Sequence, residues 1–297
     1  LGATEVCLQG GIHPDYTGQT YLDIVRTVKE AAPDIHIHAF SPLEIDQGAA
    51  TLQLPVARFL EMLRDVGLRS MPGTAAEVLD EGVRSILCPD KVTSQRWLDI
   101  MEQAHGVGLH STATIMFGHV DDARSWVRHW RQVLALQQRT QGFTEVVPLP
   151  FVSEGAPIYR RGGSRPGPTW REALLMHAVL RLTLGHAIPN VQASWVKLGQ
   201  QGALQMLSAG ANDLGGVLIN ESITRAAGAA HGQVWTPSDM QEAISGCNRS
   251  PHQRTTLYGR VSDSPAVSWG TTPVRWTDNT PAGRKENPKY VTRAISL

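Results

Sequence analysis

A pair of glycines near the start of the chain is the first feature that could contribute to a binding site. Gly10 and Gly11 end a strand-like run, where glycine lets a ligand approach the backbone closely, and His13 follows them. A tight turn accounts for the same two glycines. The pair therefore indicates either a ligand-binding loop or a simple turn.

Two histidines at positions 36 and 38 are spaced as metal ligands on a strand would be. Residues two apart on a strand face the same way, and neutral imidazoles bind divalent metals. His110, His119 and Asp213 could complete such a site, which would make the protein a metal-dependent barrel hydrolase. The helical H-E-x-x-H pattern is absent, however, and a hydrogen-bonded or solvent-facing histidine pair needs no metal.

Two further clusters carry groups that bind anions or polar substrates. Arg160, Arg161 and Arg165 are interleaved with glycines and could clamp a phosphate or carboxylate, although a solvated loop has the same composition. Asn212 and Asp213 precede a glycine pair, so they fit either a substrate contact or a turn.

The elements that must position these residues alternate between strand-like and helix-like segments, which is typical of βα units around a parallel sheet. Seven strands are predicted, at residues 3–8, 35–40, one short segment within 67–87, 109–117, 145–151, 191–196 and 206–210. Helices are predicted over 20–32, 55–66 and 94–104, from an N-cap at Asp121, from a capping box at Thr169 and Glu172, and from Thr236.

Seven strands are one fewer than the eight of a TIM-type (βα) barrel. Polar or glycine-rich residues follow nearly every strand. This distribution favours an α/β barrel over a doubly wound sheet, because barrel active sites gather at the carboxyl ends of several strands.

The composition excludes several function classes. The 297 residues carry 27 Lys+Arg and 27 Asp+Glu, and this balance gives no electrostatic signature of a nucleic-acid or anionic-membrane partner. No stretch approaches the ~20 apolar residues of a membrane-spanning helix, so we expect a cytoplasmic protein, or a stromal one in a eukaryote. Cys7, Cys88 and Cys247 are too scattered for a disulfide framework or a metal motif.

The sequence also predicts how the chain is organised. Residues 1–262 are expected to form the barrel with its C-terminal helices, whereas residues 263–297, rich in Pro, Thr, Ser and Asn, are expected to be a loosely ordered tail. The chain lacks an initiator Met and enters a strand-like run at once, which suggests a fragment whose amino-terminal part is missing.

Several long strings connect the chain to a known enzyme family. In order they are CLQGGIHP (7–14), HAFSPLEI (38–45), STATIMFGHVD (111–121), VPLPF (147–151), GPTWRE (167–172), IPNVQASWVKLG (188–199) and AGANDLGGVLINESI (209–223). Over about residues 1–260 the chain resembles the tyrosine-using half, or subunit 2, of FO synthase. That radical S-adenosylmethionine (radical SAM) family builds the deazaflavin of coenzyme F(420). The sister family of menaquinone biosynthesis, aminofutalosine synthase, shares several strings and is the nearest alternative.

The resemblance implies a radical SAM barrel that carries a 4Fe-4S cluster on a CxxxCxxC loop after its first strand. That loop is absent here, so the first βα unit is expected to be missing from this chain. The three cysteines are not spaced to replace it, because three thiolates must converge on one cluster.

By the same resemblance, the intact enzyme is a transferase that forms a C–C bond. It cleaves S-adenosylmethionine at the cluster, and the 5'-deoxyadenosyl radical abstracts hydrogen from L-tyrosine. A tyrosine fragment then joins 5-amino-6-(D-ribitylamino)uracil. The partner would be the deazaflavin-closing radical SAM half, fused or separate, with no nucleic acid or membrane involved, and this chain alone would be inactive.

The matched strings imply site residues without assigning a catalytic residue or a metal ligand. The residues implied to bind S-adenosylmethionine are Gln9, Gly10 and Gly11 in place of a GGE-type motif, His13 near the missing Glu, Ser41 and Glu44 after the next strand, and Thr114, Met116 and Gly118, with Asp121, on a strand resembling G-x-I-x-G-x-x-E. Those expected to face tyrosine or the ribityl-uracil, whose hydroxyls need several hydrogen-bond partners, are Gln192, Ser194, Lys197, Asn212 and Asp213. A degenerate barrel that only binds a partner protein is the third hypothesis, beside the metal-dependent hydrolase.

Overall fold

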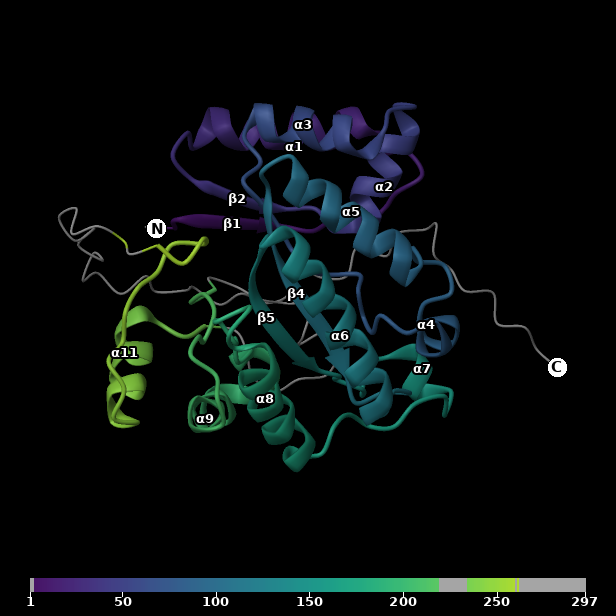
Figure 1. The fold of residues 1–297 in the computed structure, drawn as a ribbon. Coiled ribbons are helices and arrows are strands. Elements are labelled where there is room, and N and C mark those ends of the chain that lie inside the picture. The colour runs from purple at the N-terminus through teal and green to yellow at the C-terminus, as the bar shows by residue number, and fades with distance from the viewer. Residues whose placement is uncertain (1–2, 219–233, 260, 262–297) are drawn as a thin grey trace, which may run out of the picture. The chain divides into compact units, whose positions relative to one another are not determined.

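The computed structural model describes residues 3–218, 234–259 and 261 (Figure 1). The chain divides into two units, of which the first is compact and covers Ala3–Val261. All described residues belong to the first unit, so the predicted loose tail at 263–297 lies outside the described residues. Within the described ranges, no helix is long and apolar enough to cross a membrane.

A parallel sheet with its strands in sequence order forms the centre of this unit. Its strands are β1 (Glu5–Leu8), β2 (His36–Ala39), β3 (Ser70–Met71), β4 (His110–Phe117) and β5 (Phe143–Pro150). Single parallel bridges from Val146 to Val191 and from Gln192 to Asp213 extend the sheet beyond β5 by two strand positions. Seven parallel positions in sequence order fit the predicted TIM-type barrel.

The helices connect these strands, as in βα units. They are α1 (Gly18–Ala31), α2 (Pro42–Thr51), α3 (Val56–Val66), α4 (Glu81–Leu87), α5 (Ser94–Gly106), α6 (Ala123–Thr140), α7 (Pro157–Arg160), α8 (Trp170–Leu184), α9 (Trp195–Ser208) and α11 (Pro237–Gly246). Thr169 and Glu172 form the predicted capping box of α8. Helix α6 begins one residue later than predicted, because the side chain of Asp122 rather than Asp121 accepts the Ser125 N–H.

The strand predicted at residues 206–210 is wrong. Met206 lies in the last turns of α9, whose residues Ala203, Met206 and Leu207 are buried at helical spacing. The strand predicted at 191–196 is also reduced to the bridge residues Val191 and Gln192, since the chain turns into α9 directly after Ser194.

The two faces of the strands differ in polarity. Successive side chains of a strand point to opposite faces, so alternate residues share one face. Ile37, Ala113, Ile115 and Phe117 are fully buried members of the apolar core beneath the helices. The opposite, inner face carries mainly polar residues, which are His36, His38, Ser70, Thr112, Thr114 and Glu145. Barrel interiors are usually filled with branched apolar side chains, so this polar inner face is a candidate surface for binding a ligand.

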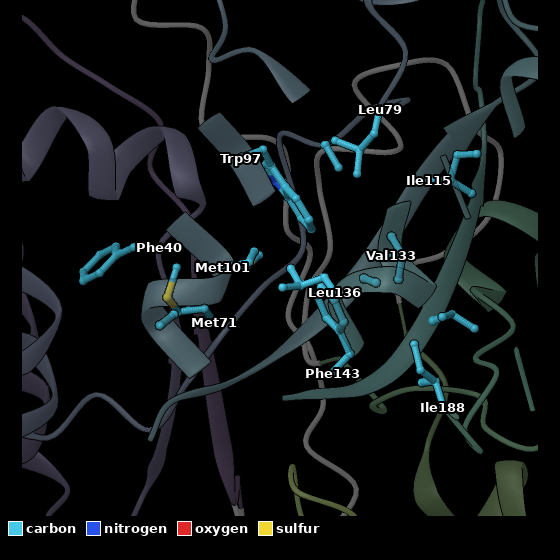
Figure 2. Close-up of a cluster of buried hydrophobic side chains, with 14 of the residues drawn as sticks. Phe40, Met71, Leu79, Trp97, Met101, Ile115, Val133, Leu136, Phe143 and Ile188 are labelled. Carbon is cyan, nitrogen blue, oxygen red and sulfur yellow. The ribbon is translucent and has the colours of Figure 1, made fainter. Parts of the chain in front are cut away.

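The apolar core holds the helices to the outer face of the sheet (Figure 2). Trp97 of α5 is fully buried and stacks on Phe143 of β5, with ring centroids 6.2 Å apart. Its indole N–H donates to the Thr74 carbonyl over 3.0 Å, so the polar atom of this large side chain is satisfied. Helix α5 therefore packs on β5 through Trp97 without leaving the indole N–H unpaired.

Truncation of a core leucine tests this packing. Leu60 of α3 is fully buried, so Leu60→Ala should lower the free energy of unfolding by about 2–5 kcal/mol through lost transfer energy and the cavity left behind. Leu182 of α8 is 78% exposed and makes Leu182→Ala a matched control with a change near zero. Urea denaturation measures both, and equal losses would contradict the assigned core.

Candidate substrate and cofactor site

The loop after β1 is held in place by one carboxylate. Glu44, almost fully buried in the first turn of α2, accepts the N–H groups of Gly10 at 2.9 Å and Gly11 at 3.0 Å on Oε1. Its Oε2 accepts the N–H and the hydroxyl of Ser41, each at 2.7 Å. The predicted cofactor residues Gly10, Gly11, Ser41 and Glu44 therefore come together, with Glu44 acting as the clamp between them.

The rest of the glycine loop is open. Gly11 has φ +70°, and a Cβ added there would meet no atom within 4 Å, so the loop has room for a ligand beside it. Gln9 donates to the Cys7 thiol at 3.2 Å. The His13 ring accepts the Asp15 N–H at 3.1 Å, and its side chain is half exposed.

The inner face of β4 brings together two of the other predicted cofactor residues. The Thr114 hydroxyl donates to the Gly73 carbonyl at 2.6 Å, and the Gly73 N–H donates to the Thr112 hydroxyl at 2.8 Å. The Met116 N–H donates to the Glu77 carbonyl at 2.9 Å. These bonds fix the loop after β3 against β4, which leaves the half-buried Met116 side chain at the inner face.

Gly118 at the end of β4 has a packing role. Its φ is +97°, and an added Cβ would stand 2.2 Å from the Pro168 ring, so no larger residue fits. Asp121, buried nearby, accepts the N–H groups of Gly118 and His119 and the indole N–H of Trp126. His119 donates from Nε2 to the Met116 carbonyl and accepts the Val120 N–H on Nδ1, which identifies the neutral tautomer.

The strongest polar cluster of the interior combines residues from three distant segments. Arg254 donates to both carboxylate oxygens of Asp213, and its guanidinium lies 4.1 Å from the centre of the Tyr258 ring. The Tyr258 hydroxyl donates to Glu145 on β5, and Arg254 is 3.6 Å from the same carboxylate. Gln192 donates to Glu145 at 3.1 Å. Two buried carboxylates thus share one guanidinium.

This crowding changes the protonation of the cluster. Burial and then the nearby Asp213 charge raise the pKa of Glu145 from its usual 4.5 to about 7, although Arg254 and the hydrogen bonds from Tyr258 and Gln192 lower it. Burial and the Glu145 charge also raise the pKa of Tyr258, so its phenol remains protonated at neutral pH. Glu145 is therefore the carboxyl group of this cluster that takes up a proton near neutral pH.

The predicted substrate residues lie in three places. Gln192 and Asp213 join the interior cluster described above. Asn212 is exposed and accepts from Arg181 and from the Val191 N–H, so it holds the bridge strand rather than facing the interior.

Ser194 and Lys197 lie at the start of α9, at the carboxyl side of the strands. Ser194 is its N-cap residue. Lys197 lines a pocket of about 250 Å³ together with Phe151 and Trp170. The structure therefore places Ser194 at the cap of α9, two residues after Gln192, and Lys197 at this pocket.

The paired histidines do not form a metal site. His36 through Nε2 and His38 through Nδ1 each bond the Ser70 hydroxyl at 2.7 Å, so one nitrogen of each ring has a partner. Burial and then Arg254 lower the pKa of His38 to about 4, so it remains neutral. His110 is exposed and Asp213 binds Arg254. Across the described part of the chain, no three His, Cys, Asp or Glu side chains are grouped to hold a metal ion, so the hydrolase hypothesis has no metal centre there.

The cysteines do not fit an iron–sulfur cluster either. Cys7 is exposed on β1, Cys88 is buried after α4, and Cys247 follows α11. Three thiolates that ligate one cluster must converge, and these belong to separate elements. The loop arginines likewise fail to converge, because Arg165 pairs with Glu172 and Arg160 donates to the Glu154 carbonyl.

Comparisons with known proteins agree with the fold and the motifs. Residues 140–266 match a family model described as CofH/MqnC C-terminal region. The chain is 49% identical over 260 residues to the 5-amino-6-(D-ribitylamino)uracil–L-tyrosine 4-hydroxyphenyl transferase of Methanopyrus kandleri, covering 88% of this chain and 70% of that protein. The chain belongs to the family of this transferase. The predicted resemblance is confirmed.

The FO synthases in the same comparison are longer proteins. Those of Streptomyces coelicolor and Nocardia farcinica are 48% and 49% identical to this member of the transferase family. The chain is covered to 89% in both matches but spans only 30% and 31% of their length. Among solved structures, methylornithine synthase (PylB) matches with a TM-score of 0.59 at 18% identity, covering 79% of this chain and 64% of that one. This likeness confirms the fold class.

Reasoning from the sequence misses three members of the interior cluster. It places Glu145 only in a strand, and it singles out neither Arg254 nor Tyr258. A carboxylate among the apolar residues of a buried strand is a signal for Glu145, since buried charges are rare without a partner. No local pattern marks Arg254 or Tyr258.

The clamp at Glu44 can be tested by an isosteric change. Glu44→Gln replaces one acceptor oxygen with an amide that cannot accept the Ser41 N–H, so we expect a loss of about 1–3 kcal/mol in the free energy of unfolding. Glu61→Gln on the exposed surface of α3 is the control, with a change below about 0.5 kcal/mol. Urea denaturation that shows no difference between the two variants would refute the clamp.

The raised pKa of Glu145 predicts a pH dependence of stability. The folded state keeps a proton that the unfolded chain loses near pH 4.5, so this stabilisation is complete below about 4.5 and is lost as the pH rises through 7. Glu145→Gln removes the titration, and the variant should therefore gain stability relative to the unmodified protein between pH 5 and pH 8. Unfolding in urea at several pH values measures this, with the exposed Glu154→Gln as control. If the unfolding free energies of Glu145→Gln and the unmodified protein changed with pH in the same way, the raised pKa of Glu145 would be contradicted.

Proposed function

We propose that this chain forms the substrate-binding barrel of a 5-amino-6-(D-ribitylamino)uracil–L-tyrosine 4-hydroxyphenyl transferase, the tyrosine-using part of FO synthase. The observation that carries the proposal is the match to the Methanopyrus kandleri transferase along most of this chain. The polar inner face of the sheet supports it, because both substrates are rich in hydrogen-bonding groups.

The loop after β1 is the proposed contact for S-adenosylmethionine. Glu44 holds the backbone of Gly10 and Gly11 in one conformation, and the space beside Gly11 admits a ligand. A ligand that meets a fixed backbone pays less ordering entropy on binding than one that must order a loop. Thr114 and Met116 line the same end of the interior from β4.

The pocket beside α9 is suited to an aromatic amino acid. Phe151 and Trp170 supply apolar and aromatic surface, and Lys197 lines the same pocket. We assign L-tyrosine to this region and the ribityl-uracil to the polar interior around Gln192 and Asp213.

The chain's own share of the reaction is positioning and exclusion of water. S-adenosylmethionine, when bound next to a reduced 4Fe-4S cluster, supplies the radical chemistry, and the cofactor rather than the protein determines that chemistry. The cysteines of this chain do not fit the cluster, so no step is assigned to them. Holding two substrates in reacting geometry is itself a large part of the rate enhancement.

The test joins this chain to the coding sequence that precedes Leu1 and purifies the product without oxygen. We expect about four irons per chain, 5'-deoxyadenosine release that depends on L-tyrosine, and a tyrosine–uracil adduct by mass spectrometry. The same protein incubated without tyrosine is the control. Absence of both iron and 5'-deoxyadenosine would exclude the radical transferase and favour a barrel that only binds a partner.

A further inference from the structure

The segment from Arg254 to Tyr258 links three strand positions that are far apart in the sequence. Arg254 pairs with Asp213 at the last bridge position, and Tyr258 donates to Glu145 on β5. Between them, the Thr256 hydroxyl donates to Glu5 on β1. The segment therefore contacts both the first strand of the sheet and its last strand position.

The polar side chains that meet this segment or flank it come from neighbouring strand positions of the sheet. Thr112 pairs with Glu145 between β4 and β5, and Gln192 is bridged to Asp213. The Gln192 N–H donates to the Val146 carbonyl, which places Gln192 next to Glu145. Gln192, Glu145 and Asp213 are joined to one another and to the segment by hydrogen bonds, in a region where a closed barrel normally packs apolar side chains.

We propose that residues 254–258 form the floor of the substrate chamber, and that Gln192 and Glu145 bind the hydroxyl groups of a polyhydroxylated chain. In the proposed reaction this chain is the ribityl group, so the inference rests on the proposed function. Gln192 and Glu145 touch the substrate. Arg254 and Tyr258 are positioning residues that hold Glu145 in place.

The hydrogen-bond pattern of Glu145 supports this assignment. Within the described residues, the bonds from Gln192 and Tyr258 and the contact with Arg254 all reach the same oxygen, Oε2. The floor therefore holds one carboxylate oxygen and leaves Oε1 as the atom that a ligand meets. A polyol needs both donors and acceptors, which the Gln192 amide and a carboxyl that protonates near neutral pH provide together.

The position of Gln192 is fixed by backbone next to it. Gly215 has φ +74°, and an added Cβ would lie 3.1 Å from the Gln192 amide oxygen, so the chain passes close to the amide. The Gly215 N–H is in turn held by Asp213 at 2.5 Å. The Gln192 amide is thus pre-organised for binding, and this lowers the ordering cost when a ligand arrives.

The experiment compares two ligands on the protein extended by its upstream sequence, using isothermal titration calorimetry. The probes are 5-amino-6-(D-ribitylamino)uracil and an analogue with a methylamino group in place of the ribitylamino group. Gln192→Leu should weaken binding of the ribityl compound about tenfold, and Tyr258→Phe about threefold, with binding of the methyl analogue nearly unchanged. Gln200→Leu, at an exposed position of α9, is the matched control and should change neither affinity.

The outcomes separate this inference from the function on which it rests. If the unmodified protein binds neither compound, both the proposed function and the chamber floor fail. If it prefers the ribityl compound and the Gln192→Leu and Tyr258→Phe variants keep that preference, only the floor assignment fails. If Gln192→Leu lowered the affinities for both compounds equally, Gln192 would have only a structural role. Tyr258→Phe loses a single hydroxyl, so it remains informative if the leucine variant does not fold.

Discussion

The placement of Arg254 between two buried carboxylates is the interaction on which the interior of this barrel depends. Glu145 and Asp213 both lie below 10% exposure, and two such charges without a cation would cost several kcal/mol. Arg254 compensates them and at the same time ties the segment after α11 to the last strand position. The same contacts align Tyr258 with Glu145, so charge compensation and the closing of the chamber depend on the same residues.

Side chains alternate between the two faces of each strand, and this separates the polar groups of the site from the apolar core. Apolar residues on the outer face pack under the helices, whereas the inner face presents hydroxyl, imidazole, amide and carboxyl groups. At the other end of the interior, Glu44 uses both carboxylate oxygens to fix the glycine loop against the start of α2. A polar interior with the glycine loop fixed at one end and residues 254–258 fixed at the other suits the proposed transferase, whose substrates must be held together away from water.

Local patterns in the sequence predict much of this fold. The strands β2, β4 and β5 and the capping box at Thr169 arise from residues close together in the sequence, so local patterns can predict them. The structure confirms these predictions. The strand prediction at residues 206–210 is wrong because a short apolar run fits a strand or a helix end equally well. The Tyr258–Glu145 contact spans 113 residues, and such pairs are set by tertiary folding alone. Family resemblance locates the Gly10-Gly11 loop, Glu44, Gln192 and Asp213, whereas the bonds among them and the roles of Arg254 and Tyr258 come from the structure.

The most direct test of Arg254 as the compensating charge is the unfolding free energy of Arg254→Met at two pH values. At pH 8, above the pKa of Glu145 in the unmodified protein, the variant lacks the cation that compensates this buried carboxylate, and we expect a loss of about 3 kcal/mol relative to the unmodified protein. At pH 5 Glu145 is protonated, since its pKa is raised to about 7, and the loss should be clearly smaller. Equal losses at pH 5 and pH 8, or no loss at either, would contradict the assignment of Arg254 as the residue that holds the interior together.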